Sequence, residues 1–114
     1  MASFGSNLKL TIHTDHQPRV HALFTEVFGC SFQEPMPGLS LYVFGDGACV
    51  GAYFGDQGLP DDVAQLAPWL EFTVDDVERT RGAMAKLDIE AVPYAVDPDH
   101  TYHRIPGGPV FRIA

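Results

Sequence analysis

Residues 8–29 constrain the fold of this chain more than any other stretch. Leu8, Leu10 and Ile12 alternate with polar residues, which is the period of a strand with one buried face. An apolar stripe at helical spacing follows, made up of Val20, Leu23, Phe24, Val27 and Phe28. Gly29 is suited to a left-handed helix end. We therefore expect a strand that runs into a helix, with the helix packed on the apolar strand face.

The other face of the same strand carries Lys9, Thr11 and His13. Successive side chains of a strand point to opposite sides, so these three residues should point away from the helix. They are therefore the first candidates for a functional surface.

Three further strands are expected in this half of the chain, over residues 30–34, 39–44 and 48–54. The first should end at Pro35 and Pro37, because proline cannot donate to a strand ladder. The other two flank Gly45-Asp46-Gly47, a hairpin signal.

The pattern then begins again after a connector over residues 55–68, which includes a short helical turn at 61–66. Residues 69–74 alternate like the first strand. Asp75 or Asp76 should cap a second helix over 77–87, with Glu78 as the capping-box partner of Asp75. Strands are expected over 90–96, 100–105 and 109–113.

A shift of 60 residues places Leu10 on Leu70, Ile12 on Phe72 and Phe24 on Met84. This internal repeat predicts an α+β fold of two βαβββ modules that form a curled mixed sheet around a cavity. We expect one domain over residues 1–114, with modules at about 8–54 and 69–113.

Charge and composition exclude several classes of partner. Seven Lys and Arg against fifteen Asp and Glu give a net charge of −8, which argues against nucleic acid. No run reaches the roughly 18 apolar residues of a membrane span, and residues 1–7 lack signal-peptide features. We therefore expect no membrane partner and a cytoplasmic location. Cys30 and Cys49 lack metal-ligand spacing and should be buried free thiols.

Two paired modules of this size resemble the vicinal oxygen chelate superfamily, which includes glyoxalase I, extradiol dioxygenases, fosfomycin-resistance transferases and bleomycin-resistance proteins. The resemblance rests on Phe24-Thr-Glu-Val-Phe-Gly29, Phe72-Thr-Val-Asp-Asp-Val77 and Gly108-Pro-Val-Phe-Arg-Ile113. It covers about residues 8–113. It implies a cavity lined by both halves of the fold, and relatives of this kind are commonly dimers.

The resemblance also implies where metal ligands would lie, and those positions hold Lys9, Trp69 and Arg112. None of the three is an ordinary ligand, because charged Lys and Arg and the Trp indole only donate hydrogen bonds. Residues 48–54 offer no His, Asp or Glu for a further ligand. We therefore expect no metal at the family position and no cofactor.

By strand alternation, the predicted ligand-binding set is Lys9, Thr11, His13, Trp69, Glu71 and Arg112. One interpretation is a buried ion network of Lys9, Glu71 and Arg112 that holds the halves together, since buried charges must be paired. The other is a ligand site in which Lys9 and Arg112 attract an anion or a carbonyl group and Trp69 stacks on its flat part.

His13 and Glu71 are the candidate catalytic bases, because histidine changes its charge near neutral pH and carboxylates accept protons. His100 and His103, with Asp97 and Asp99, form a second cluster. Residues three apart on a strand face opposite ways, which opposes joint metal binding there, whereas on a turn they could converge.

Together these features predict a metal-independent small-molecule binding protein, resembling the bleomycin-resistance type, that forms a homodimer. One alternative is a glyoxalase-like lyase, isomerase or transferase, with a relocated metal site or with His13 or Glu71 as base. Another is a structural or regulatory dimer in which the polar residues form only an interface network.

Overall fold

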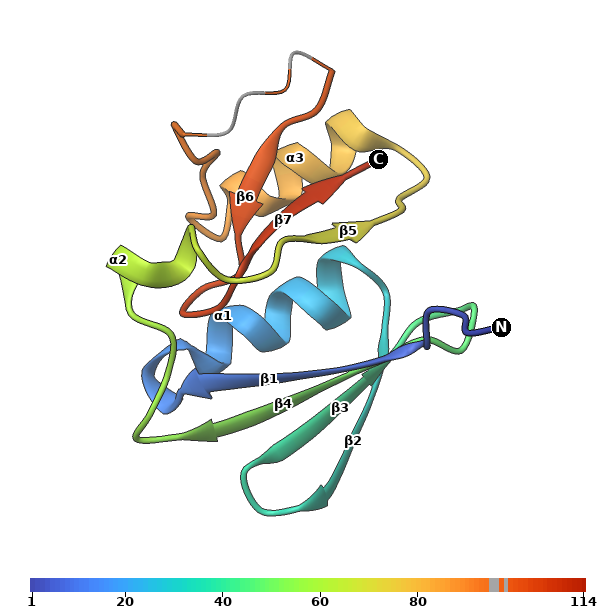
Figure 1. Cartoon of the computed structure of the whole chain (residues 1–114), viewed down its shortest axis with the longest axis vertical. Helices are drawn as coiled ribbons and strands as arrows, with labels where there is room; N and C mark the ends of the chain where they lie inside the picture. The colour runs from blue at the N-terminus through green and yellow to red at the C-terminus, as the bar shows by residue number, and fades with distance from the viewer. Residues whose placement is uncertain (95–96, 98) are drawn as a thin grey trace.

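The computed structural model describes residues 1–94, 97 and 99–114 and contains two sheets (Figure 1). The first half consists of β1 (Asn7–His13), the 3-10 turn η1 (Thr14–His16), α1 (Gln17–Ala22), the π-helical turn η2 (Leu23–Val27), β2 (Ser31–Met36), β3 (Leu39–Val43) and β4 (Cys49–Gly55). The second half consists of α2 (Asp61–Ala64), β5 (Leu70–Phe72), α3 (Val77–Ala85), β6 (Tyr102–Arg104) and β7 (Val110–Ile113).

The two sheets have the same strand order, which confirms the α+β fold of two repeated modules. The first is ordered β1-β4-β3-β2 and the second β5-β7-β6. In each, the first strand runs parallel to the last and the other pairs are antiparallel. They are two separate sheets, whereas the sequence predicted one curled sheet.

Within the described residues 90–94 of the strand expected over 90–96, the structure contains one bridge, between Ala91 and His103. The Val92 N–H donates to the Tyr102 carbonyl next to it. This short segment takes the place of a fourth strand beside β6. Ala95 and Val96 of the predicted strand lie outside the described residues.

The first helix ends as the sequence predicted. Gly29 has a φ of 74°, a left-handed conformation that glycine adopts without strain. The Cys30 N–H then donates to the Phe24 carbonyl at 2.9 Å. The last turn is π-helical, so the helix widens where its aromatic residues enter the core.

Two local predictions were wrong. β2 continues through Pro35, because it is an edge strand whose register shifts between Gln33 and Met36, so no ladder bond needs the missing N–H. The second error concerns the start of α3: of the two predicted caps, Asp76 is confirmed, since it accepts from the Arg79 N–H, but it does so without the predicted partner. The capping box is absent, and Glu78 pairs with Arg81.

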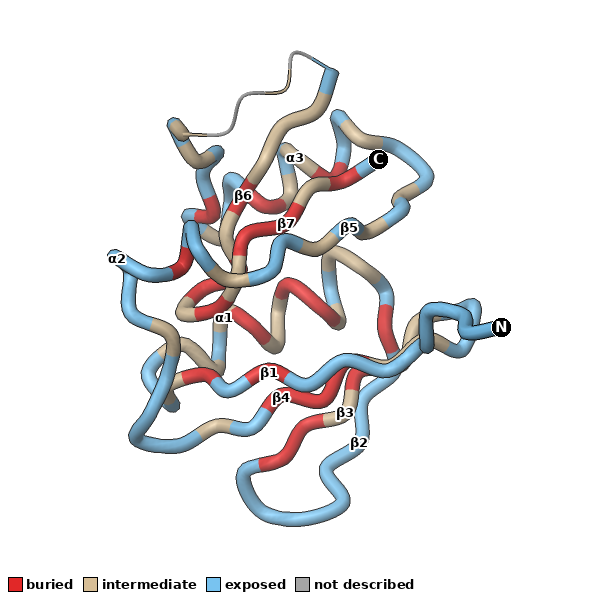
Figure 2. The backbone as a smooth tube through the Cα atoms, viewed as in Figure 1, coloured by how far each residue is buried: buried red, intermediate tan, exposed pale blue. Residues whose placement is uncertain are grey.

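The helix-covered faces of both sheets meet in one apolar core (Figure 2). The shared residues include Leu10, Ile12, Val20, Leu23, Phe24, Tyr42, Val50, Ala52, Met84, Ile89, Ile105, Phe111 and Ile113. Phe24 stacks on Tyr42 of the first sheet and makes an edge contact with Phe72 of the second. The uncovered faces of the two sheets therefore point outward; we call them the first open face and the second open face.

Both cysteines are free; Cys30 is buried and Cys49 is half-buried. Burial, with Cys49 and Asp46 nearby, raises the pKa of the Cys30 thiol to about 11. Among the described residues, no helix is long and apolar enough to cross a membrane.

Candidate functional site

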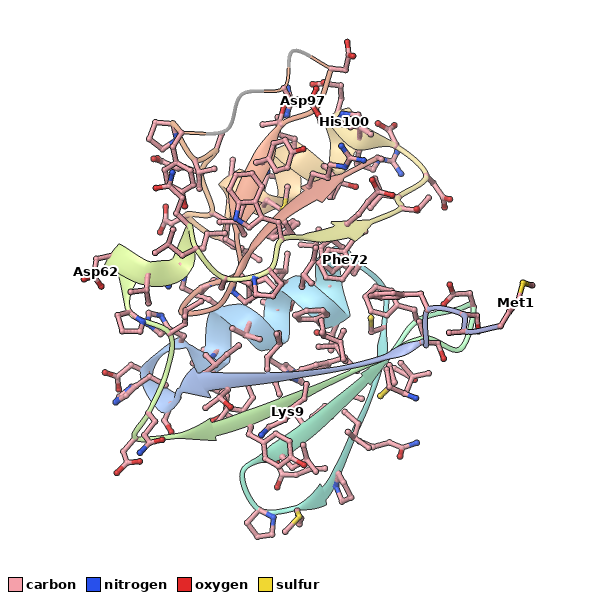
Figure 3. All side chains as sticks on the ribbon, in the orientation of Figure 1. Met1, Lys9, Asp62, Phe72, Asp97 and His100 are labelled. Carbon is pink, nitrogen blue, oxygen red and sulfur yellow. The ribbon has the colours of Figure 1, made fainter. Side chains whose placement is uncertain are left out.

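The second open face carries a connected group of polar side chains. Strand register places Glu71 beside Arg112 and Arg112 beside Tyr102, all on the side away from the core. The segment before β6 adds Asp97 and His100. We call these five residues the Arg112 cluster; Figure 3 labels Asp97 and His100 at this end of the molecule.

Arg112 is held by both neighbouring carboxylates. Its Nε donates to Glu71 Oε2 at 2.6 Å, and its Nη1 donates to Asp97 Oδ2 at 3.3 Å and to the Tyr102 hydroxyl at 3.3 Å. The hydrogen bonds to Tyr102 and Glu71 raise the pKa of Arg112 above its usual value. One cation thus faces two carboxylates, and the surplus of positive charge predicted for an anionic ligand is absent from this cluster.

Asp97 accepts hydrogen bonds from His100, Tyr102 and Arg112 of the Arg112 cluster and from a backbone N–H. Its Oδ2 accepts from His100 Nδ1 at 2.8 Å and from the Tyr102 hydroxyl at 3.2 Å, and its Oδ1 accepts from the Asp99 N–H at 2.9 Å. The Asp99 N–H, followed by His100 and Tyr102, lowers the pKa of the Asp97 carboxyl. Asp97 is therefore ionised at neutral pH and acts only as an acceptor.

An aromatic wall flanks the Arg112 cluster. Trp69 lies just before β5 and is 40% exposed. Its ring centroid is 5.2 Å from that of Tyr102 and 6.2 Å from that of Tyr94. The Trp69 indole N–H donates to the Gln65 carbonyl, which fixes the ring against the connector. The second open face thus offers a flat apolar surface beside fixed polar groups.

The other predicted site residues lie on the first sheet. Lys9 and Thr11 are exposed on the first open face, and Lys9 Nζ lies 4.9 Å from the centroid of the Tyr53 ring. His13 lies at the end of β1, where its Nδ1 accepts from the Asp15 N–H at 3.1 Å.

Within one chain, the structure brings Trp69, Glu71 and Arg112 together and keeps them apart from Lys9, Thr11 and His13. The single space expected to hold all six residues is not formed, because both sheets turn their helix-covered faces into the shared core. Figure 3 shows the consequence: His100 lies near the upper end of the long axis, whereas Lys9 lies in the lower half of the molecule.

A groove of about 340 Å³ runs along β1. The groove is lined by Leu8 to Thr11 of β1, by Gln57 to Leu59 and Ala67 to Pro68 of the connector, and by Leu70 and Pro109. Lys9 is the one charged residue among these. Because the lining of this groove is largely apolar, the groove offers fewer polar groups to a ligand than the Arg112 cluster does.

His100 and His103 do not share a site. His103 is 2% exposed and stacks on Phe111 in the core, whereas His100 bonds Asp97 on the second open face. Burial, and then the nearby Arg81 charge, lower the pKa of His103. Within residues 1–94, 97 and 99–114, no group of three or more His, Cys, Asp or Glu side chains could hold a metal ion.

Sequence reasoning missed that Asp97, His100 and Tyr102 are partners of Arg112. The sequence did contain one signal, the antiparallel pairing expected between the last two strands. This pairing puts Tyr102 beside Arg112, and it brings the segment that precedes Tyr102 close to Arg112. From the sequence, Asp97 and His100 were candidates only for a metal site.

Solved structures with the same fold include two fosfomycin resistance proteins. A point mutant of FosX from Listeria monocytogenes, complexed with Mn(II) and 1S,2S-dihydroxypropylphosphonic acid, superposes with a TM-score of 0.76 at 14% identity, over 99% of this chain and 90% of that chain. FosX from Mesorhizobium loti gives a TM-score of 0.72 at 16% identity, over 99% and 92% of the two chains.

A third structure, a protein from Bacillus anthracis described as belonging to a glyoxalase family, gives a TM-score of 0.69 at 13% identity, over 99% of this chain and 94% of that chain. No protein-family model and no curated protein matches the chain. The three structures belong to the vicinal oxygen chelate superfamily, so the resemblance drawn from the sequence is confirmed for the fold.

Proposed function

We propose that this chain, which has the fold of the fosfomycin-resistance and glyoxalase-family proteins, is a small-molecule binding protein that works without a metal. The observation that carries the proposal is the pairing, on the second open face, of the Trp69 wall with the Arg112 cluster. An aromatic surface beside a few fixed polar groups is the usual composition of a small-ligand site. The sequestering mode of the bleomycin-resistance type is our first choice.

The donor set at the family's metal positions does not fit a metal ion. Trp69 and Arg112 are both engaged as hydrogen-bond donors, and the Lys9 ammonium sits on the Tyr53 ring. None of the three can offer a lone pair in these states. What this chain offers a ligand is stacking on Trp69, acceptors on Glu71 and Asp97, and the remaining donors of Arg112.

The charges of the Arg112 cluster favour a neutral or cationic ligand with a flat part. Two carboxylates face one guanidinium, and Glu71 is 46% exposed and reachable from solvent. An added anion would be repelled by these carboxylates, whereas a cation could also lie on the Trp69 face.

We also propose that the working unit is a homodimer and that residues 1–114 form one domain of two modules, 8–54 and 69–113. The shared core supports the single domain. Support for the dimer comes from the outward direction of both open faces, since neither can enclose a ligand within its own chain. In a dimer, the first open face of one copy, with Lys9 and the 42% exposed Tyr53, would cover the second open face of the other.

Fluorescence titration of chelator-treated protein tests the binding site directly, because Trp69 is the only tryptophan. We expect benzylamine and benzamide to change the Trp69 emission and benzoate, which has the same ring, to bind more weakly. Light scattering during gel filtration should give the mass of two chains. Binding that appears only after Mn²⁺ or Zn²⁺ is added would contradict the metal-independent site.

A further inference from the structure

Two histidines differ in which ring nitrogen is left open. His13 Nδ1 accepts the Asp15 N–H, so neutral His13 carries its proton on Nε2. His100 Nδ1 faces the Asp97 carboxylate at 2.8 Å and must donate to it, so neutral His100 has an unprotonated Nε2. Of these two histidines, only His100 therefore presents a ring nitrogen with a free lone pair.

The surroundings hold His100 in this state. Asp97 is fixed by the Tyr102 hydroxyl, the Asp99 N–H and Arg112 Nη1, so the acceptor that orients the imidazole cannot easily turn away. The His100 side chain is 30% exposed, and its Nε2 has no hydrogen-bond partner among the residues that the structure describes. A carboxylate on one ring nitrogen and an open second nitrogen is the arrangement that orients a general base.

Arg112 completes the arrangement. Its Nη1 lies 3.5 Å from His100 Nδ1, while Nε and Nη1 are used by Glu71, Asp97 and Tyr102. Its Nη2 makes no hydrogen bond to any described residue. Although Glu71 and Asp97 balance the charge of Arg112, its open N–H can still donate a hydrogen bond to a carbonyl oxygen next to the base and so stabilise the negative charge that develops there.

We propose that the second open face is a proton-transfer site in which His100 is the general base, Asp97 its positioning residue and Arg112 the stabiliser of the developing oxyanion. The substrate class is a small carbonyl compound with a flat part on Trp69. This inference rests on the proposed ligand site and replaces His13 and Glu71 as base candidates: His13 presents a protonated Nε2, and Glu71 is paired with Arg112.

The simplest balanced reaction is hydrolysis of an activated ester. His100 Nε2 takes a proton from water while the water oxygen bonds to the carbonyl carbon, and the electron pair of the carbonyl double bond moves to oxygen beside Arg112. The electron pair on that oxygen then re-forms the carbonyl double bond, the bond from the carbonyl carbon to the leaving oxygen breaks, and the leaving group departs as an anion. The carboxylic acid is the other product; it ionises in solvent, and His100 also releases its proton to solvent.

The test uses 4-nitrophenyl acetate with the full chain and His100→Gln. We expect protein-dependent release of 4-nitrophenolate to fall by about tenfold in H100Q, below the 100-fold or more of an evolved base because the ester is a generic probe. His16→Gln, at a histidine outside the predicted site residues and outside the Arg112 cluster, is the matched control and should stay within about twofold of the unmodified chain. Equal rates for the unmodified chain and H100Q would overturn the inference.

Asp97→Asn tests the positioning role through a spectroscopic signature. Two-bond ¹H–¹⁵N correlation spectra of the unmodified chain should show the proton of neutral His100 on Nδ1. In D97N that preference should weaken and the hydrolysis rate should fall with it, whereas D97E should restore part of both. A proton on Nε2 of His100 in the unmodified chain would overturn the inference.

Binding of 4-nitroacetanilide, an unreactive amide of the same shape, separates this inference from the proposed function. Trp69 quenching that is equal in the unmodified chain and H100Q, with hydrolysis lost only in H100Q, supports both. Equal quenching with equal hydrolysis overturns the base and leaves the binding site standing. Hydrolysis lost in H100Q without any quenching supports the base and overturns the Trp69 binding surface.

Discussion

The two open faces are built on the same strand order and yet carry different chemistry. On the first open face, Lys9 rests on the Tyr53 ring and has no ion-pair partner among the described residues. On the second, Arg112 is fixed by Glu71, Asp97 and Tyr102. The repeated topology therefore provides two equivalent platforms, and a few side chains decide which of them can hold and polarise a ligand.

The difference comes from the segment that leads into the third strand position of each sheet. In the second module, Asp97 and His100 precede β6; Asp97 accepts a hydrogen bond from Arg112, and His100 bonds to Asp97. In the first, Pro37 and Gly38 form a tight turn into β3 that carries no polar side chain. Most of the functional contrast between the modules thus lies in one short connection.

The largest expected effect comes from truncating Phe24, a core residue that packs against both sheets. Phe24 is fully buried and contacts aromatic residues of both sheets. Phe24→Ala should lower the free energy of unfolding by about 3–5 kcal/mol, through lost burial and the cavity left behind. Urea denaturation measures this loss. Phe32→Ala, at a 43% exposed position on β2, is the control and should cost much less; equal losses would contradict a shared core.

The next effect separates the two open faces by binding. Arg112→Met should weaken benzamide binding, followed by Trp69 emission, by about tenfold, the loss typical of one charge-assisted hydrogen bond. Lys9→Met is the matched control, and in the proposed dimer it should have a smaller effect. If K9M weakened binding as much as R112M, the first open face would be an equal part of the site.

A smaller effect distinguishes how the two helices begin. Asp76 caps α3 with its side chain, whereas α1 starts behind a 3-10 turn without a side-chain cap. Asp76→Ala should lower the free energy of unfolding by about 1 kcal/mol. Asp75→Ala, one residue earlier, should leave it nearly unchanged. Thermal denaturation of both variants shows which aspartate caps the helix. An equal loss of stability in D75A would support the capping box expected from the sequence.

The smallest effect is a pH dependence that arises behind the second sheet. Burial and Arg81 lower the pKa of His103 below its ordinary 6.5, so as the pH falls the unfolded chain binds this proton first. The His103 contribution to stability is therefore complete above pH 6.5 and is lost as the pH falls below it. His103→Phe should flatten this part of the curve and remove a buried Nδ1 that lacks a partner. Urea midpoints from pH 7.5 to 5.0 test this, and an unchanged slope in H103F would contradict it.

Local pattern predicted most of the backbone. The alternation of Leu10 and Ile12, the helical stripe around Phe24 and the glycine at position 29 all proved to be what they suggested. These features depend on neighbours within a few residues, so sequence spacing is enough to find them. The errors at Pro35 and Asp75 arose where tertiary context chose between two local solutions.

The site was predicted only in part. Strand alternation correctly put Glu71 and Arg112 on one face, with Trp69 beside them. It could not bring in Asp97 and His100, because they lie outside regular strands and reach Arg112 only through the path of the chain before β6. Nor could it tell His13 from His100 as a base, since the open nitrogen depends on which atom faces Nδ1.

The sequence by itself determined the repeated pattern of strands and helices and which face of each element is apolar. Only the tertiary structure decided that the two helix-covered faces share one core, so that the open faces point outward and the six predicted site residues divide into two groups. The physical reason is that periodicity records which side of an element is apolar. Which apolar sides meet depends on how the modules bury them against each other.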